Sequence, residues 1–156
     1  MTKIALVHDY LVNMGGSEKV LEQLIELYPD APVYTAVYKP DSVSEKINSA
    51  KIYTSFLQRF PGATEKWQLY LALMPLAFEH FDLRDYDLVI SSSHACAKEV
   101  LPRPDACHIC YCHTPMRYAW SAYEQYRDAS GGVKRLLFPL VMRYLRNRDR
   151  RSAERV

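Results

Sequence analysis

The segment from Cys107 to Trp120, which reads CHICYCHTPMRYAW, constrains the fold more than any other part of the chain. It opens with a short run of β-branched, aromatic and cysteine residues, a composition typical of a parallel strand buried on both faces. The run ends at His113–Pro115, because proline has no amide hydrogen to give to a neighbouring strand. Arg117 and Tyr118 follow directly. Ligands of open α/β sheets bind beyond the carboxyl ends of the strands, so we predict a functional site here.

The first thirty residues predict the opening of a βαβ unit. Ile4–Val7 is expected to be a short buried strand, with His8 and Asp9 at its carboxyl end. A loop then leads to Gly15-Gly16, after which apolar residues recur at helical spacing until Pro29. Adjacent glycines let a backbone approach a ligand closely, and the first amides of a helix can receive a phosphate. A plain tight turn is the competing interpretation of this glycine pair.

Three further strands are expected, at Val33–Tyr38, Lys51–Thr54 and Tyr86–Ile90. The last of them is followed by three serines and a histidine, so Ser93 and His94 either bind a polar ligand or cap the next helix. Strands that alternate with helical segments over 156 residues predict a single α/β domain. Its expected architecture is a Rossmann-like open parallel sheet with helices on both faces.

Composition argues against several classes of protein. An apolar content of 49% and a charged content of 24% are those of an ordinary globular domain, and a formal net charge of +2 is too small to predict a nucleic-acid partner. The chain has neither G-x-G-x-x-G nor G-x-x-x-x-G-K-[ST], which argues against a nicotinamide dehydrogenase and a P-loop enzyme. No apolar run reaches the roughly 18 residues of a membrane span, and the N-terminus turns polar too early for a signal peptide.

The four cysteines are candidates for disulfides, metal binding or core packing. Three of them, Cys107, Cys110 and Cys112, fall on one predicted strand, where successive side chains point to opposite faces. This alternation argues against one shared zinc ion, and the sequence holds no second cysteine pair to complete such a site. We therefore expect buried free thiols, no metal or cofactor, and a cytoplasmic protein.

Two apolar segments allow two interpretations. Residues 56–81 are apolar around most of a helical circumference and are interrupted by Pro75, so they form either core or a patch that meets a membrane. From Val133 onward, apolar residues repeat every three or four positions with basic residues between them, which predicts a basic amphipathic tail over about 133–156. Such a helix covers a sheet or lies on anionic lipid; in the second case the protein is peripheral on the inner face of the cell membrane.

Five motifs, taken in order, resemble the N-terminal domain of retaining GT-B glycosyltransferases of family 4. They are Val7–Tyr10 (VHDY), Gly15–Glu22 (GGSEKVLE), Asp30–Tyr34 (DAPVY), Ser91–His94 (SSSH) and Cys112–Tyr118 (CHTPMRY). The likeness extends over nearly the whole chain, and it looks closest to bacterial mannosyltransferase-like enzymes of polysaccharide and O-antigen assembly. It implies the N-terminal half of a GT-B fold, a Rossmann-like acceptor domain that faces a second such domain across a cleft.

The resemblance also implies roles for single residues. Gly15 and Gly16 match the glycine loop that approaches the donor's diphosphate. His113 matches the histidine of a His-x-Pro motif that lies against the transferred sugar, which makes it the catalytic candidate. The remaining candidates for the acceptor or the cleft are His8 and Asp9, placed by strand position alone, and Ser93, His94, Arg117 and Tyr118.

The activity implied is retaining transfer of a hexose from a GDP- or UDP-sugar to a glycan or polyprenyl-linked acceptor. No metal is required where backbone amides, a helix N-terminus and basic groups stabilise the departing diphosphate. The family's donor-binding domain, with its Glu-x7-Glu motif, does not occur in this sequence. We therefore expect half of an active site, inactive without that C-terminal domain. The alternatives are a stand-alone module that binds a nucleotide, sugar phosphate or lipid head group, and a structural dimerisation domain.

Overall fold

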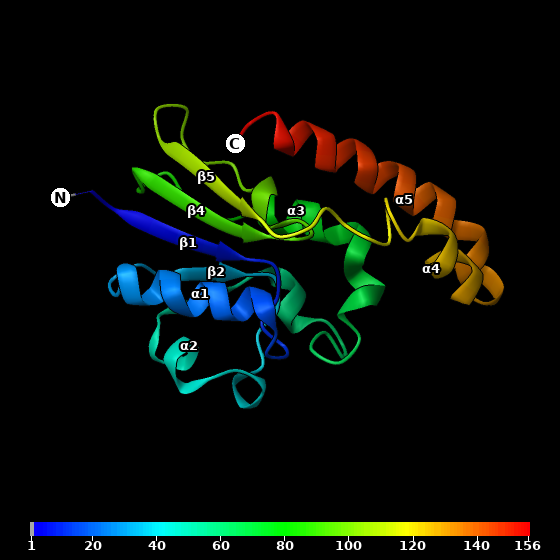
Figure 1. Cartoon of the computed structure of the whole chain (residues 1–156), viewed down its shortest axis with the longest axis horizontal. Coiled ribbons are helices and arrows are strands. Elements are labelled where there is room, and N and C mark those ends of the chain that lie inside the picture. Colours follow the sequence, from blue (N-terminus) through cyan, green and yellow to red (C-terminus); the bar gives the residue numbers. More distant parts are fainter. Residues whose placement is uncertain (1) are drawn as a thin grey trace.

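A five-stranded parallel sheet forms the centre of the molecule, which a computed structural model describes over residues 2–156 (Figure 1). All neighbouring strands are parallel, in the order β3-β2-β1-β4-β5. Because the order reverses at β1, the carboxyl ends of β1 and β4 lie side by side at the switch point where such sheets bind ligands. The strands are β1 (Ile4–His8), β2 (Val33–Thr35), β3 (Ile52–Thr54), β4 (Leu88–Ser93) and β5 (Cys107–Cys112).

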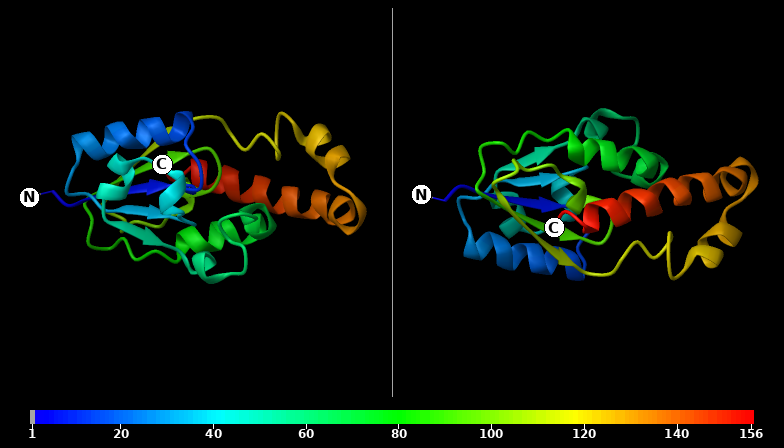
Figure 2. Two further views of the ribbon diagram at one scale, coloured as in Figure 1. Left: turned by 90° about the horizontal axis from the view of Figure 1, so that it is seen from below. Right: turned by 90° about the horizontal axis from the view of Figure 1, so that it is seen from above.

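Helices cover both faces of the sheet, which confirms the predicted α/β class (Figure 2). One face carries α1 (Gly16–Leu27) and α2 (Glu45–Ser49). The other carries α3 (Met74–Glu79) and the end of α5 (Gly132–Ala153), with α4 (Tyr123–Ala129) beyond the carboxyl edge. Short 3-10 segments complete the list: η1 (Pro40–Ser42), η2 (Phe56–Arg59), η3 (Trp67–Leu73) and η4 (Ala97–Glu99).

The central strand β1 is apolar on both faces, as parallel strands with two helical layers require. Leu6 is fully buried in one core cluster with Leu21 of α1. Val7 is fully buried in the other cluster with Phe78 of α3. Burial of each such side chain contributes about 1.5–3 kcal/mol, so the sheet is clamped from both sides.

The prediction that the Cys107–Cys112 strand is buried on both faces is wrong. This strand, β5, lies at the edge of the sheet, and Ile109 and Tyr111 are 52% and 53% exposed. The expectation of buried thiols holds for Cys96 alone, since the three cysteines of β5 are exposed or half-buried. Composition within one strand does not distinguish a central strand from an edge strand, because burial depends on neighbours elsewhere in the chain.

Three other predicted elements differ in extent from the observed ones, among them the strand expected over Tyr86–Ile90, which spans Leu88–Ser93. The strand expected over Val33–Tyr38 ends at Thr35, and Tyr38 pairs separately with Leu11 in an isolated bridge. The helix expected after His94 is the single 3-10 turn η4, and the three serines before it belong to β4. These serines therefore do not cap a helix.

The basic tail forms the predicted helix, but only its second half covers the sheet. It begins beyond the carboxyl edge and runs back toward β5 (Figures 1 and 2). Leu145 is buried, whereas Leu136 is 77% exposed. The carboxylate of Asp149 anchors the buried half, because it accepts hydrogen bonds from the ammonium of Lys98 and from the indole nitrogen of Trp120.

Replacement of this anchor should loosen α5. The change Asp149→Ala leaves the buried Lys98 ammonium without its partner, which costs about 3–5 kcal/mol. We expect the free energy of unfolding in urea to fall by that amount. The matched control is Asp128→Ala, which removes only exposed ion pairs worth about 0–1 kcal/mol. Equal losses in the two variants would contradict the anchor.

Candidate functional site

A cavity of about 930 Å³ opens beside the carboxyl edge of the sheet. One wall is formed by the ends of the β1–α1, β4–η4 and β5–α4 connections, and it brings together six predicted residues: Gly15, Gly16, His94, His113, Arg117 and Tyr118. The opposite wall is apolar and comes from η3 and α5, with Trp67, Leu71, Leu137, Phe138 and Val141. The glycine loop and His113, far apart in the sequence, therefore lie beside one cavity at the carboxyl edge of the parallel sheet.

The glycine loop is held by the side chain of Glu18. One carboxylate oxygen, Oε2, accepts hydrogen bonds from the amide of Gly15 at 2.8 Å and from the hydroxyl of Ser17 at 2.9 Å. A Cβ atom at Gly15 would come within 3.1 Å of the same oxygen, so a side chain there would press on the carboxylate. A Cβ atom at Gly16 would meet nothing within 4 Å. The backbone at Gly16 is therefore open to a ligand.

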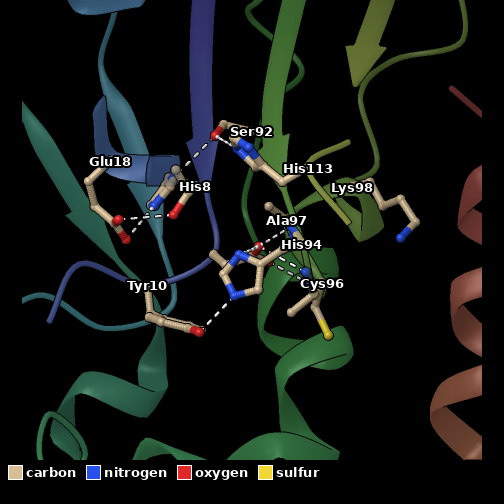
Figure 3. A network of polar contacts seen from close by, with 12 residues as sticks. His8, Tyr10, Glu18, Ser92, His94, Cys96, Ala97, Lys98 and His113 are labelled. Atoms are coloured by element: carbon tan, nitrogen blue, oxygen red, sulfur yellow. Dashed lines mark hydrogen bonds and ion pairs between the residues drawn. The ribbon is translucent and has the colours of Figure 1, made fainter. Parts of the chain in front are cut away.

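A row of polar side chains connects this loop to His113 (Figure 3). His8 is paired with Ser92 in the parallel register of β1 and β4, and its Nδ1 lies 3.2 Å from the Ser92 hydroxyl. Its Nε2 lies 3.3 Å from Oε1 of Glu18. The Ser92 hydroxyl also lies 2.8 Å from Nε2 of His113. Residues that are up to 105 positions apart in the sequence, from His8 to His113, thus belong to one hydrogen-bonded row over the sheet.

His113 is a half-buried imidazole at the cavity wall. Burial, together with the repulsion that His8 and His94 exert when they are protonated, lowers its pKa below the usual 6.5. The ring lies against Tyr111, with ring centroids 5.0 Å apart. Its Nδ1 makes no hydrogen bond to any of residues 2–156. At neutral pH the side chain is therefore an uncharged imidazole with one nitrogen free for a ligand.

Asp9 has a different role from the one expected. Its carboxylate is fully buried and accepts hydrogen bonds at 2.6–2.9 Å from four consecutive backbone amides, those of His94, Ala95, Cys96 and Ala97. Its Oδ2 also lies 3.0 Å from Nδ1 of His94. Burial opposes ionisation, but the bond to His94 and the nearby positive charges outweigh it and hold the pKa of Asp9 well below its usual value.

Three predicted cleft residues do not reach the cavity. His8, Asp9 and Ser93 are all 0% exposed, so their placement at a cleft mouth is wrong. The reason is that β1 and β4 are central strands, whose last residues lie beneath the start of α1 and the segment after β4. Position at a strand end does not ensure access to solvent. The hydroxyl of Ser93 has no hydrogen-bond partner among residues 2–156.

The other predicted residues line the cavity in different ways. His94 is held from both sides, because its Nε2 lies 2.7 Å from the hydroxyl of Tyr10 and its Nδ1 faces Asp9. Arg117 is exposed and is free to move toward a ligand. The hydroxyl of Tyr118 is buried and lacks a hydrogen-bond partner within residues 2–156. Burial raises the pKa of that hydroxyl, so Tyr118 is an uncharged hydrogen-bond donor.

Sequence reasoning missed Glu18, Ser92 and the apolar wall. A signal for Glu18 was available, because a glutamate at the third helical position often bonds back to the backbone before the helix. Ser92 carried no signal of its own, since only the pairing of β1 with β4 places it between two histidines. The apolar wall depends on how α5 folds back, which its own periodicity does not specify.

No group of three or more His, Cys, Asp or Glu side chains within residues 2–156 is arranged to hold a metal ion. Within the same residues, no helix combines the length and apolar character needed to cross a membrane. In comparisons with known proteins, no family model, no curated protein and no solved structure matches this chain.

The Asp9–His94 pair should make stability depend on pH. Burial lowers the pKa of His94, but the hydrogen bond and charge of Asp9 outweigh it, and the net effect raises that pKa above 6.5. The folded state therefore holds this proton more tightly than the unfolded state. Its stabilisation is fully present below about pH 6.5 and is lost as the pH rises through the folded-state value.

We expect the free energy of unfolding of the wild type to fall between about pH 6.5 and 7.5, below the pKa of about 8.5 at which cysteines of the unfolded chain titrate. The change His94→Gln should remove most of that slope, measured by urea unfolding at a series of pH values. A wild-type profile that is flat or rising in this window would contradict the assignment.

Proposed function

We propose that this chain is the acceptor-side domain of a retaining glycosyltransferase. The reaction moves a hexose from a nucleotide-sugar to a glycan or lipid-linked acceptor, and a separate donor-binding domain completes the site. The single observation that carries the proposal is the placement of the glycine loop, Gly15 and Gly16, and of His113 beside one cavity, with a hydrogen-bonded row that runs from the Gly15 amide through Glu18, His8 and Ser92 to His113. The motifs that resemble family 4 enzymes contribute these same residues.

The glycine loop offers donors to the departing diphosphate. The amides of Gly16 and Ser17 begin a helix of 12 residues and have no hydrogen-bond acceptor among residues 2–156. A helix N-terminus with free amides favours an anion. Arg117 lines the same cavity and adds a mobile positive charge. In the proposed reaction these groups stabilise the diphosphate as the glycosidic bond breaks.

His113 is proposed to bind a hydroxyl of the transferred sugar. The bond between the anomeric carbon and the diphosphate oxygen breaks, and the acceptor hydroxyl forms the new bond on the same face, while its proton passes to the departing diphosphate. A retaining glycosidase would instead need two carboxylates about 5 Å apart at the bond. Asp9 is sealed and Glu18 is bonded to the loop, so neither is available for that role.

The same observation favours a second candidate, a module that binds a nucleotide, sugar phosphate or lipid head group without catalysis. The carboxylates of Asp9 and Glu18 are both hydrogen-bonded within the fold. The chain therefore offers ligand-binding groups but no carboxylate that is free to act as an acid or a base. Mixing the chain with a separately made donor-binding domain and a labelled nucleotide-sugar separates the two candidates. Transfer to an acceptor supports the transferase, and binding without transfer supports the module.

The change His113→Ala is the sharpest test of the transferase. In the mixed assay we expect a loss of about 10²-fold in kcat/KM, because the hydroxyl contact is removed, with little change in the free energy of unfolding. The matched control is His108→Ala on β5, whose ring bonds to Ser91 and does not line the cavity. A His113→Ala variant with wild-type turnover would remove the main assignment.

A peripheral membrane contact is the second part of the proposal. Along one stripe of α5, Val133, Leu136 and Leu140 are 72%, 77% and 66% exposed. Arg143 lies beside this stripe, and Lys134 lies at the start of the helix, where it also lines the cavity; neither forms an ion pair with any of residues 2–156. Apolar side chains bordered by basic ones are typical of helices that lie on anionic lipid.

The apolar segment 56–81 has both buried and exposed side chains. Leu57, Met74 and Phe78 are fully buried in the core, whereas Leu69 and Leu76 are 55% and 48% exposed. The core interpretation therefore holds for the buried residues, and the exposed leucines remain available for the membrane contact. We propose that the exposed leucines extend the lipid-facing surface of α5.

Vesicle sedimentation tests this contact. We expect the chain to bind vesicles that contain phosphatidylglycerol at low salt and to dissociate as the salt concentration rises. The double change Leu136→Gln and Leu140→Gln should weaken binding by about tenfold or more, since each leucine contributes about 1.5–3 kcal/mol. Leu27→Gln, at a 69% exposed site on α1, is the control. No binding at low salt, or equal loss in the control, would contradict the proposal.

A further inference from the structure

The row from Glu18 to His113 has a direction, which follows from counting its donors and acceptors. Glu18 is almost fully buried, and its carboxylate already accepts hydrogen bonds from the Gly15 amide and the Ser17 hydroxyl. Burial opposes its ionisation, but the bonds from His8 and Ser17 outweigh this and lower its pKa, so it is an anion that only accepts. The nitrogen of His8 that faces it, Nε2, must therefore carry a hydrogen.

The remaining hydrogens then have one arrangement when the imidazoles are uncharged. A neutral His8 with hydrogen on Nε2 has a bare Nδ1, which accepts the hydrogen of the Ser92 hydroxyl. The Ser92 hydroxyl donates its only hydrogen to His8. Its oxygen can therefore only accept a hydrogen bond from Nε2 of His113. His113 must then carry its hydrogen on Nε2, and its Nδ1 is left bare.

We propose that Glu18, acting through His8 and Ser92, locks His113 in the Nε2–H tautomer and so presents Nδ1 to the cavity as a hydrogen-bond acceptor. Glu18 and Ser92 are positioning residues in this arrangement, because they set the tautomer of His113; Glu18 also holds the glycine loop. The tautomer of His113 follows from these hydrogen bonds whether or not the chain belongs to an enzyme. Its consequence for catalysis rests on the proposed function.

The lock also specifies the ligand. A bare nitrogen accepts a hydrogen bond from a hydroxyl group, and it leaves an ether or a missing hydroxyl unpaired. The site therefore favours a sugar that presents a free hydroxyl at this point over its deoxy or O-methyl analogue. Sites built to bond a hydroxyl can reject the analogue that lacks it by a large factor.

The tautomer is measured directly by proton–nitrogen correlation spectra of the imidazole rings of the ¹⁵N-labelled chain at about pH 8, where histidines are largely neutral. We expect His113 to show the Nε2–H form alone in the wild type. The changes Ser92→Ala and Glu18→Gln should both release the lock, so that the Nδ1–H form appears. Ser92→Thr keeps the hydroxyl and should restore the wild-type spectrum.

The strand offers a matched control, because Ser91 bonds to His108 at 3.0 Å on the opposite face of the same strands. Ser91→Ala should alter the His108 signals and leave His113 unchanged. The proposal is overturned if the wild type shows mainly the Nδ1–H form, or if Ser92→Ala leaves the His113 spectrum unaltered.

Activity provides a separate readout. In the mixed transfer assay, Ser92→Ala and Glu18→Gln should lower kcat by about 10- to 100-fold with a smaller change in KM. Transfer that persists without the expected spectra would end the tautomer proposal and keep the transferase. The expected spectra without any transfer would support the tautomer proposal and contradict the transferase.

Discussion

The burial of one carboxylate, that of Asp9, sets the geometry of the whole site. A charged group without solvent must be paired and hydrogen-bonded throughout, or its desolvation outweighs the gain from folding. Asp9 meets this condition through four consecutive amides after β4 and through His94. The end of β1 is thereby tied to the segment that follows β4. His94 is fixed at the cavity wall as a consequence.

His8 and Asp9 are neighbours in sequence yet serve opposite faces of the sheet. Successive residues of a strand alternate between faces, so His8 meets Glu18 at the start of α1 while Asp9 meets the η4 side. One short strand end therefore fastens both helical layers at the point where the sheet order reverses. The side chains of His8 and Asp9 bond to other parts of the fold and do not reach the cavity. They hold in place the residues that do, such as His94.

The cavity combines two kinds of wall because two parts of the chain meet there. The polar wall arises at the strand ends, where the rings of His94 and His113 and the amide of Gly15 are hydrogen-bonded to neighbouring elements. The apolar wall comes from η3 and from the middle of α5, whose far half is held by polar contacts of Arg146, Arg148 and Asp149. The cavity therefore combines hydrogen-bonding groups and apolar side chains in one lining.

The sequence by itself determined the class of fold and the neighbourhood of the site. Buried runs that end in polar residues, helical stripes between them and a proline after His113 are local signals, because strand and helix periodicity are properties of a few adjacent residues. Tertiary structure alone decided which strands are central and which is the edge, so it buried His8, Asp9 and Ser93 and exposed Ile109 and Tyr111. It also placed Ser92 between two histidines and divided α5 into anchored and exposed halves. Burial and hydrogen-bond partners are properties of the packed chain, since they depend on residues far apart in sequence that meet only when the sheet has formed.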